Sequence, residues 1–385
     1  MKNVLLIGGS SGLGLSLLSE LLPNVDNIIV FDKKPIDYIV FPISQDLKKK
    51  VKFVEFNLFS DDFTKLKKYI PKVDSLIITA GFGRLAQVQD LSDCETKKLF
   101  YVNALSPIRI IKFFQEKIFS DNDFYTAVVG SIAGHIVSPL FSVYGAAKSS
   151  LSSFVSSMNV ELIAQNKKNR ILDISPGSIQ GTSFYGKETN LNQLADLSKT
   201  ILDKMIDREV LFIPNYESVY KAVLEKNFIN PIKFGVDSYN YKISCNRPIL
   251  KRQIIIGYLS GTFDLFHIGH LNLLKKAKDH CDYLIVGVHE SGAWKGKETY
   301  IPFKERLEIV QSIKYVDLAV KSLDEDSDAW KKYHYDKLFV GSDYKGSERF
   351  KRYEEYFKNR NVEIIYFPYT KGTSSTQLRS KINNK

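Results

Sequence analysis

The stretch LLIGGSSGLG at residues 5–14 decides how the first part of the chain folds. An apolar run leads directly into a turn that contains Gly8, Gly12 and Gly14. Glycine permits a tight turn and a close approach of the backbone, so a pyrophosphate can lie on the N-terminal amides of a following helix. The same spacing also occurs in ordinary turns. The stretch therefore predicts a strand, a turn and a helix, with a dinucleotide site as one interpretation of the turn.

Short apolar runs alternate with amphipathic stretches after this turn. Helical periodicity is found, for example, over residues 91–118 and 143–166. Such alternation predicts a parallel sheet with helices on both faces. The predicted strands of this part are residues 3–8, 27–32, 51–56, 74–80, 125–131 and 170–176.

The pattern weakens over residues 231–251, which are polar and aromatic and include Pro231 and Pro248. We interpret this stretch as the end of the first domain plus a linker, because the alternation then begins again. The sequence predicts an α/β fold with two doubly wound parallel-sheet (Rossmann-like) domains in tandem, residues 1–230 and 252–385. The predicted strands of the second domain are residues 252–260, 282–289, 316–322, 336–342 and 362–368.

Charge and cysteine content narrow the class of protein. The 385 residues include 54 Lys and Arg against 43 Asp and Glu, a net charge of +11. The surplus suits anionic partners, and because it forms no single basic block it favours small phosphorylated substrates over nucleic acid. The three cysteines show no paired spacing, which is typical of reduced thiols. With no signal peptide and no apolar run of about 20 residues, we expect a cytoplasmic protein without a membrane segment.

Three residues further along the first domain suggest carbonyl chemistry. Ser131 ends a predicted strand, and Tyr144 and Lys148 lie four residues apart, on one face of a helix. The ammonium is expected to lower the pKa of the phenol, which makes Tyr144 a proton donor to a carbonyl oxygen that Ser131 also binds. A Tyr and a Lys one turn apart are more often only a helix surface. Together with the glycine turn and Ser131, the catalytic interpretation is favoured.

With these motifs, residues 1–230 resemble the short-chain dehydrogenase/reductase family. The resemblance places the family's catalytic tetrad on Asn103, Ser131, Tyr144 and Lys148, with Asn103 holding a proton-relay water and Lys148 contacting the nicotinamide ribose. The segment SPGSIQGT, residues 175–182, is similar to the family's segment beside the nicotinamide. The cofactor-binding residues that the resemblance implies are Gly8, Ser10, Ser11, Gly12, Leu13, Gly14, Asp32, Asn57, Ala80, Gly81, Tyr144, Lys148, Pro176, Gly177 and Thr182.

The cofactor is predicted to be NADH or NADPH. Asp32 ends the second strand, where a carboxylate accepts hydrogen bonds from ribose hydroxyls and repels a 2′-phosphate, which favours NADH. Lys33 and Lys34 follow at once and offset this preference in favour of NADPH.

A second motif, GTFDLFHIGH at residues 261–270, opens the second domain. A helix that begins near Ile268 places His267 and His270 at its N-terminus, where the dipole and free amides favour phosphate. Two ring N–H donors there stabilise charge on a phosphoryl group under attack. Zinc is the competing interpretation, but the pair supplies only two ligands and no Cys or His cluster completes a set.

The motif resembles that of the glycerol-3-phosphate cytidylyltransferase family, over residues 252–385. The resemblance implies CTP with Mg²⁺ on its triphosphate, and it makes His267, His270 and Lys295 the catalytic residues. Lys295 lies in a loop over the triphosphate, and Ser374, Ser375 and Thr376 cap a helix that faces the phosphates. The implied nucleotide-binding residues are Gly261, Thr262, Phe263, Asp264, His267, His270, Lys295, Lys314, Asp343, Tyr344, Ser374, Ser375 and Thr376.

Two such domains in one chain predict an enzyme that reduces a ketose phosphate and couples the alditol phosphate to CTP. Fructose 6-phosphate and ribulose 5-phosphate are the favoured substrates, and the product is a CDP-alditol for capsule or other surface polysaccharide. One alternative is a reductase that acts on a CDP-linked keto sugar after nucleotidyl transfer. Another is a dinucleotide-sensing domain that regulates a nucleotidyltransferase. We expect a homo-oligomer, a dimer or a tetramer, because both families commonly dimerise.

Overall fold

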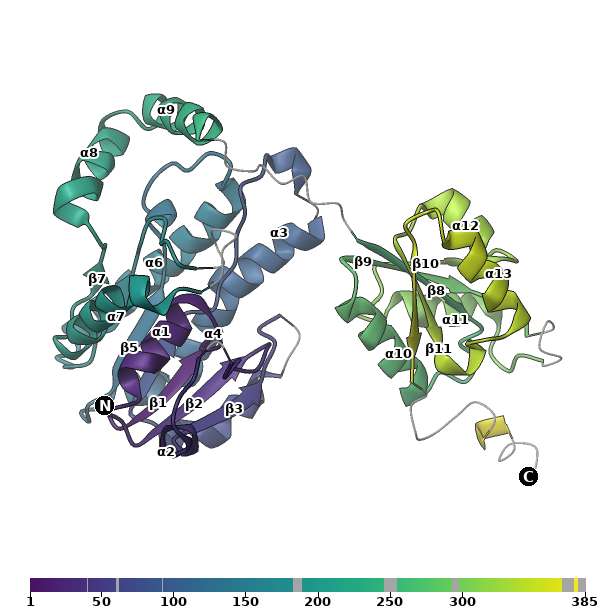
Figure 1. Ribbon diagram of the computed structural model, residues 1–385, viewed down its shortest axis with the longest axis horizontal. Helices are drawn as coiled ribbons and strands as arrows, with labels where there is room; N and C mark the ends of the chain where they lie inside the picture. Colours follow the sequence, from purple (N-terminus) through teal and green to yellow (C-terminus); the bar gives the residue numbers. More distant parts are fainter. Residues whose placement is uncertain are drawn as a thin grey trace. The chain divides into compact units, whose positions relative to one another are not determined.

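The computed structural model describes residues 1–39, 41–59, 62–91, 93–182, 189–245, 255–292, 298–368 and 377–379 (Figure 1). The chain divides into two compact units, Met1–Lys251 and Arg252–Lys385. Within the described ranges, no helix is both long and apolar enough to cross a membrane.

The first unit is built on a seven-stranded sheet with the order β3-β2-β1-β4-β5-β6-β7. Every pair of neighbouring strands is parallel. The strand order reverses between β1 and β4, so a crevice is expected at the carboxyl ends of these two strands. The strands are β1 (Asn3–Ile7), β2 (Asn27–Asp32), β3 (Val51–Glu55), β4 (Ser75–Ile78), β5 (Tyr125–Val129), β6 (Ile171–Ile174) and β7 (Leu211–Phe212).

Helices cover both faces of this sheet, as the alternation predicts. Leu5 and Ile7 of β1 face one apolar core, and Val4 and Leu6 face the other. Because both faces are buried, the strands read as continuous apolar runs. The helices are α1 (Gly12–Leu21), α2 (Gln45–Lys49), α3 (Asp93–Phe100), α4 (Ser106–Phe113), α5 (Gln115–Ile118), α6 (Ser142–Ala164), α7 (Leu191–Ile206), α8 (Lys221–Ile229) and α9 (Pro231–Ser244).

Most of the stretch interpreted as a domain end and linker is a helix. Residues 231–244 form α9, whose N-cap Asn230 accepts a hydrogen bond from the Lys233 amide at 2.9 Å. Pro231 is the first residue of the helix. An N–H at this position has no partner within the helix, so proline loses no hydrogen bond there, and its fixed φ favours the helix. The prediction took this proline as a break, whereas it marks a helix start. The short edge strand β7 was also not predicted.

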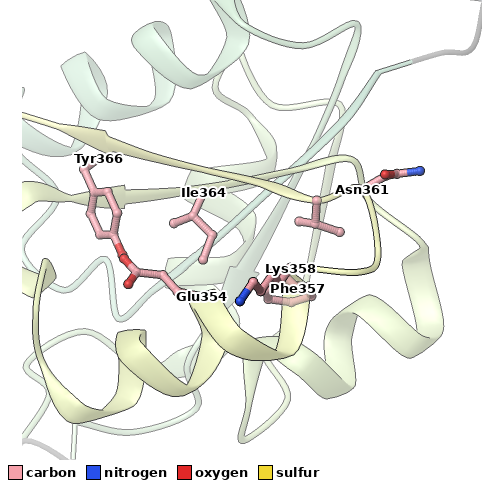
Figure 2. A pocket seen from close by; sticks show the side chains of 7 residues that line it. Glu354, Phe357, Lys358, Asn361, Ile364 and Tyr366 are labelled. Carbon is pink, nitrogen blue, oxygen red and sulfur yellow. The ribbon is translucent and has the colours of Figure 1, made fainter.

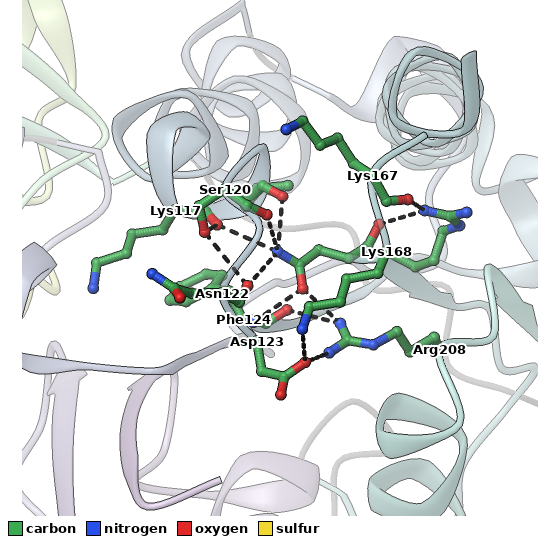
Figure 3. Close-up of polar contacts among 11 residues, drawn as sticks. Lys117, Ser120, Asn122, Asp123, Phe124, Lys167, Lys168 and Arg208 are labelled. Carbon is green, nitrogen blue, oxygen red and sulfur yellow. Dashed lines mark hydrogen bonds and ion pairs between the residues drawn. The ribbon is translucent and has the colours of Figure 1, made fainter. Parts of the chain in front are cut away.

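A buried asparagine holds the loops at the amino ends of β5 and β6 together. Asn169 has no solvent exposure, and its Oδ1 accepts hydrogen bonds from the Phe124 amide at 3.0 Å and from Arg208 Nη1 at 2.8 Å. Its Nδ2 donates to the carbonyl oxygens of Asn122 at 2.9 Å and Ile118 at 3.1 Å. Figure 3 shows Asn122, Phe124 and Arg208 gathered around this point. The network lies at the opposite strand ends from the glycine turn, so it serves the fold.

The second unit contains a five-stranded parallel sheet with the order β10-β9-β8-β11-β12. Its order reverses between β8 and β11, which again predicts a site at the carboxyl ends of the two strands. The strands are β8 (Ile256–Gly261), β9 (Tyr283–Val288), β10 (Leu318–Lys321), β11 (Lys337–Gly341) and β12 (Glu363–Phe367). The helices are α10 (Ile268–Asp279), α11 (Phe303–Gln311), α12 (Asp326–Tyr333) and α13 (Glu348–Phe357).

Candidate active sites

The glycine turn after β1 leaves no room for side chains at two of its glycines. A Cβ atom added to Gly14 would lie 1.9 Å from the carbonyl oxygen of Gly8, and one added to Gly8 would lie 2.5 Å from the Ala80 nitrogen. Gly8 and Gly12 have positive φ angles of +93° and +53°, which favour glycine. Thr79 Oγ1, just after β4, donates to the Gly8 carbonyl at 2.9 Å. The turn is therefore packed directly on the loop after β4, at the topological switch point.

Asp32, at the end of β2, lies beside the same turn. Its Oδ2 accepts a hydrogen bond from the Ser10 amide at 2.9 Å, and its Oδ1 accepts one from the Lys33 amide at 2.6 Å. The carboxylate therefore lies where the ribose of a dinucleotide is bound in this type of sheet. Together with the cramped turn before α1, these residues fit a nicotinamide dinucleotide.

Thr182 and Thr189 approach the turn from another part of the chain. The Gly12 amide donates to Thr189 Oγ1 at 2.8 Å, and a Cβ on Gly12 would lie 3.7 Å from the Thr182 side chain. Ser11 is the N-cap residue of α1, and Leu13 is buried behind it. Thr182 thus lies near the glycines, as the cofactor interpretation requires.

A single π-helical turn carries Asn103 between α3 and α4. The Asn103 side chain is fully buried, donates from Nδ2 to the Phe82 carbonyl at 2.8 Å, and accepts from the Phe82 amide at 3.2 Å. A Cβ on Gly81 would lie 2.9 Å from Asn103 Oδ1 and 3.4 Å from Lys148 Nζ. The fold therefore brings these three residues together, and π turns of this kind are frequent at functional sites.

Ser131, Tyr144 and Lys148 are also assembled. Ser131 follows β5 and caps a short 3₁₀ turn, and its side chain is hydrogen-bonded to that of Tyr144 on α6. Lys148 Nζ donates to the carbonyl oxygen of Val129 at 2.7 Å and lies 5.8 Å from the centre of the Tyr144 ring. Both Tyr144 and Lys148 are buried on the same face of α6.

The prediction that Lys148 lowers the pKa of Tyr144 is wrong in this structure. Burial raises the pKa of Tyr144 to about 12, against the smaller effect of the Ser131 hydrogen bond. Burial also lowers the pKa of Lys148 to about 8, although the charge of Asp173 raises it. In both cases the largest cause is the loss of hydration, which disfavours the charged form of each group. Tyr144 therefore keeps its proton at neutral pH, which is the state that a proton donor needs.

The two histidines of the GTFDLFHIGH motif, His267 and His270, lie at the start of α10. His267 is the N-cap residue, and its Nδ1 accepts a hydrogen bond from the Gly269 amide at 3.0 Å. Because the accepting nitrogen carries no proton, this bond assigns the proton of the neutral ring to Nε2. The rings of His267 and His270 are stacked with their centroids 3.9 Å apart. Burial lowers the pKa of His267, so its ring is neutral at pH 7.

Asp264, in the loop between β8 and α10, is buried and connects distant parts of the chain. Its Oδ1 accepts a hydrogen bond from the Ile301 amide at 3.0 Å, and its Oδ2 pairs with Arg379 Nη2 at 2.7 Å. The neighbours Phe263 and Leu265 have positive φ angles of 53° and 47°. Backbone strain of this kind costs about 1–3 kcal/mol per residue and is found mainly at functional sites.

Arg306 on α11 is entirely buried and was not selected from the sequence. It donates hydrogen bonds to four backbone carbonyls, those of Ile301, Thr262, His289 and Glu290. Thr262 lies in the connection between β8 and α10, and the other three carbonyls lie in the connection between β9 and α11, so one guanidinium joins two loops at the carboxyl edge of the sheet. The sequence contained one indication of this role: Arg306 occupies a position of the helix where the periodicity predicts an apolar residue.

Comparisons with known proteins assign a family to each of the two domains. Residues 2–193 match the family model "short chain dehydrogenase", and residues 258–381 match the model "Cytidylyltransferase-like". A glycerol-3-phosphate cytidylyltransferase of Staphylococcus aureus is 33% identical over 129 residues, which cover 32% of this chain and 92% of that protein. One from Bacillus spizizenii is 37% identical over 123 residues, 31% of this chain and 90% of that protein. The chain joins a short-chain dehydrogenase domain to a cytidylyltransferase-like domain.

The families make the chain an enzyme with an oxidoreductase activity and a nucleotidyltransferase activity. The dehydrogenase domain also matches an uncharacterized oxidoreductase of Saccharomyces cerevisiae, with 26% identity over 202 residues, 50% of this chain and 64% of that protein. A crystal structure of a short-chain dehydrogenase from Streptomyces avermitilis overlaps 64% of this chain and all of its own, at 16% identity and a TM-score of 0.49.

Two other predicted residues of the dehydrogenase domain lie beside its site. The Pro176 carbonyl accepts a hydrogen bond from the Ile132 amide at 2.9 Å, next to Ser131, so the segment after β6 is fixed to the segment after β5. Gly177 has no space for a side chain, because a Cβ there would lie 1.6 Å from Tyr220 Oη. The role of Asn57 at adenine stays a prediction.

A polar cluster below Lys148 was missed in the sequence. His135 Nε2 lies 2.9 Å from Ser175 Oγ, which donates to Asp173 Oδ1 at 2.8 Å. Gly130 makes room for the cluster, because a Cβ there would lie 2.3 Å from Asp173 Oδ1. Asp173 is buried on β6. A charged residue inside an apolar run was the feature of the sequence that could have indicated this cluster.

The remaining predicted residues of the transferase domain are only partly placed. Asp343 and Tyr344 form a 3₁₀ turn after β11, at the same sheet edge as His267. Lys314 is exposed between α11 and β10, with its Nζ 5.1 Å from the centre of the Tyr315 ring, and its contact with phosphate stays a prediction. The predicted residues Lys295, Ser374, Ser375 and Thr376 lie outside the described residues.

The described residues also bear on metal binding and on pockets away from the predicted sites. They contain no group of three or more His, Cys, Asp or Glu side chains that is able to hold a metal ion. Figure 2 shows a pocket between α13 and β12, lined by Glu354, Phe357, Lys358 and Tyr366 among others. Tyr366 donates to Glu354 Oε1 at 2.6 Å across its edge. None of the predicted nucleotide-binding residues lines this pocket.

Proposed function

We propose that the chain makes a CDP-alditol from a ketose phosphate in two steps. The dehydrogenase domain reduces the ketose phosphate with NAD(P)H and a proton to an alditol phosphate and NAD(P)⁺. The transferase domain then joins the alditol phosphate to CTP and releases pyrophosphate. An open-chain polyol has no anomeric carbon, so it is activated through a terminal phosphate rather than as a glycosyl nucleotide. Fructose 6-phosphate and ribulose 5-phosphate are the proposed substrates, and the product is a donor for surface polysaccharide in the cytoplasm of a bacterium.

The observation that carries the proposal is the presence of both assembled sites in one chain. Tyr144, Lys148, Ser131 and Asn103 are gathered in the first unit, and His267 and His270 are stacked at a helix N-terminus in the second. Several relatives of the transferase domain are named for glycerol 3-phosphate, which is itself a polyol phosphate. A reductase fused to such a domain supports a substrate whose polyol form must first be made.

In the reductive step a nicotinamide held by the glycine turn and Asp32 would supply a hydride to the carbonyl carbon. Tyr144 donates its phenolic proton to the carbonyl oxygen, which the Ser131 hydroxyl also binds. The charged Lys148 nearby stabilises the phenolate that remains. Because the pKa of Tyr144 is about 12, its proton is transferred only as negative charge develops on the oxygen.

In the transfer step a phosphate oxygen of the alditol phosphate attacks the α-phosphorus of CTP, and the bond to the β-phosphate breaks. The amides at the start of α10 and the Nε2–H group of His267 donate hydrogen bonds to the phosphoryl oxygens as charge builds up. Mg²⁺ bound to the triphosphate would supply positive charge beside the leaving pyrophosphate. The position of Asp32 beside the glycine turn supports NADH as the reductant of the first step.

Purified full-length protein with a panel of ketose phosphates, NADH or NADPH, and CTP provides the test. We expect cofactor oxidation without CTP, and a CDP-alditol by mass spectrometry once CTP is added. Reduction of CDP-linked keto sugars only would reverse the order of the steps, and no reduction of any substrate would leave the first domain as a sensor. Either result contradicts the proposal.

Single variants separate the two activities. Tyr144→Phe is expected to abolish reduction and to leave transfer to a supplied alditol phosphate unchanged. His270→Ala is expected to do the reverse. Loss of both activities in either folded variant would rule out two independent sites.

A further inference from the structure

Helices α8 and α9, shown in green in Figure 1, form a cap on the loop that leads from Ser131 to Tyr144. Asn227 Oδ1 on α8 accepts a hydrogen bond from the Val137 amide at 2.9 Å. A Cβ on Gly235 of α9 would lie 3.1 Å from the Val137 side chain, so the helix backbone rests directly on the loop. The cap therefore lies beside the place where the carbonyl substrate must enter.

Lys242, near the end of α9, also contacts this loop. Its Nζ donates hydrogen bonds to Ser138 Oγ at 2.9 Å and to the Pro139 carbonyl at 2.8 Å. The same ammonium lies 5.3 Å from the centre of the Phe141 ring, which is 5.4 Å from the centre of the Tyr144 ring. These two separations place the ammonium no more than about 11 Å from the ring of Tyr144.

We propose that Lys242 binds the phosphate group of the ketose phosphate while the carbonyl group lies against Tyr144. This inference rests on the proposed function and adds the residue that recognises the substrate class. An ammonium has three N–H donors, and the two hydrogen bonds to Ser138 and Pro139 leave one for a phosphate oxygen. Hydrogen bonds between charged partners are about twice as strong as neutral ones.

The electrostatic setting of Lys242 favours an anionic ligand. Among the described residues, no carboxylate forms an ion pair with it. Burial lowers the pKa of Lys242 to about 8, because the charged ammonium is poorly hydrated there and has no counter-charge in the described part of the chain. A phosphate dianion supplies that counter-charge, and the other substrate groups of a ketose are neutral.

A second cation near the site, Arg84 on the loop after β4, already forms an ion pair with Glu95. The loop after β4 is joined to the Ser131–Tyr144 loop by a hydrogen bond from the Ala86 amide to the Leu140 carbonyl at 2.9 Å. It carries Arg84, whose Nε and Nη2 donate to both carboxylate oxygens of Glu95 at 2.7 and 2.9 Å. A bidentate pair of this kind is geometrically satisfied, so Arg84 does not replace Lys242 as the phosphate ligand.

The separation also suits a sugar phosphate. With covalent bonds of about 1.5 Å and hydrogen bonds of about 2.8 Å, the chain from the carbonyl of a 2-ketose to its terminal phosphate spans this distance. A neutral ketose of the same length makes the carbonyl contact but not the contact with Lys242. Lys242 therefore distinguishes substrates by the charge of their terminal group.

The test compares phosphorylated and neutral substrates in matched variants. Lys242→Ala is expected to raise the KM for fructose 6-phosphate or ribulose 5-phosphate by about tenfold to hundredfold, the range for a lost hydrogen bond to a charged group. The KM for fructose or ribulose, and the KM for the reduced cofactor, are expected to stay within about twofold. Lys242→Arg should restore much of the loss. Lys233→Ala, on the exposed side of the same helix, is the control and should change nothing.

The outcomes separate this inference from the proposed function. If Lys242→Ala raised the KM equally for phosphorylated and neutral ketoses, Lys242 would only hold the cap in place. If the substitution left the KM for ketose phosphates unchanged, Lys242 would not bind the substrate. Either result overturns the inference while ketose phosphate reduction by the unmodified protein stands. If the unmodified protein reduces no ketose phosphate, the proposed function fails and this inference fails with it.

Discussion

Asp264 and Arg379 are 115 residues apart in the sequence, and their side chains meet with 2.7 Å between Oδ2 and Nη2. Asp264 belongs to the loop of the GTFDLFHIGH motif, and Arg379 lies three residues after Thr376, the last of the predicted nucleotide-binding residues. The carboxylate is 2% exposed, so its charge depends on this cation and on the amides of Tyr300 and Ile301. The pair therefore ties the two ends of the transferase site to each other.

Removing the cation should damage the transferase selectively. Arg379→Ala leaves a buried charge without its partner, which typically costs about 3–5 kcal/mol. We expect at least a tenfold loss of kcat/KM for nucleotidyl transfer and a lower melting temperature for this domain, with cofactor oxidation by the dehydrogenase unchanged. The control is Arg360→Ala, an exposed arginine that stacks on Tyr356 with 4.0 Å to the ring centre. Unchanged transfer in the Arg379 variant would contradict the role of the pair.

A methyl group at Gly14 should disable the reductase. The added Cβ would lie 1.9 Å from the Gly8 carbonyl oxygen, so α1 must move away from the turn. Overpacking of this kind costs about 1–3 kcal/mol, and it displaces the amides expected to hold the pyrophosphate. We expect Gly14→Ala to weaken binding of the reduced cofactor at least tenfold, as measured by fluorescence titration, and to leave nucleotidyl transfer intact. Glu20→Ala on the same helix should bind the cofactor normally.

The pH dependence of reduction should follow Lys148. Burial lowers the pKa of Lys148 to about 8, whereas that of Tyr144 is about 12, so only the lysine titrates in the accessible range. The charged lysine is the active form, and kcat/KM is therefore expected to fall as the pH rises above about 8. Asp173 raises this pKa, so Asp173→Asn should move the alkaline limb of the profile to lower pH. If the alkaline limb of the Asp173→Asn profile stayed in place or moved to higher pH, Lys148 would not be the group that controls it.

Lys242 complicates this profile, because burial lowers its pKa to about 8 as well. The charge of Asp173 does not contribute to the pKa of Lys242, so the Asp173→Asn shift isolates Lys148. Nucleotidyl transfer by the same variant, measured over the same pH range, shows whether the substitution leaves the rest of the protein intact.

The sequence predicted those features that depend on local backbone rules. The glycine turn is one example, because Gly8 has a positive φ angle and a side chain at Gly14 would meet the nearby Gly8 carbonyl oxygen. The pair Tyr144 and Lys148 is another, since helical spacing alone puts both on one face. Strand positions were predicted to within a few residues for the same reason, except for β7, which has only two residues.

The features that were missed depend on contacts between distant segments. The pKa of Tyr144 was predicted in the wrong direction, because spacing reveals the neighbouring ammonium but not the burial of both groups. Arg306 contacts two loops, the one between β8 and α10 and the one between β9 and α11, and no local sequence pattern predicts these contacts. Lys242 lies in a stretch that was interpreted as a linker, and only the fold shows that α9 rests on the loop before Tyr144.

His267 has two separable roles, and two substitutions should divide them. Its Nδ1 caps α10 by accepting a hydrogen bond from the Gly269 amide, while Nε2–H is the proposed donor to the phosphoryl group. Asparagine is a good N-cap residue whose Oδ1 takes the place of Nδ1, and it has no donor at the position of Nε2. Glutamine places its amide N–H near the position of Nε2 but caps poorly. Loss of a cap costs about 0.5–2 kcal/mol.

We therefore expect His267→Asn to keep the melting temperature of the transferase domain and to lose nucleotidyl transfer by at least a hundredfold, as removal of a single oxyanion donor typically does. His267→Gln should show the opposite pattern, with lower stability and more residual activity. Thermal unfolding and release of pyrophosphate from CTP measure the two properties in the same preparations. Full transfer activity in the asparagine variant would show that Nε2 takes no part in the reaction.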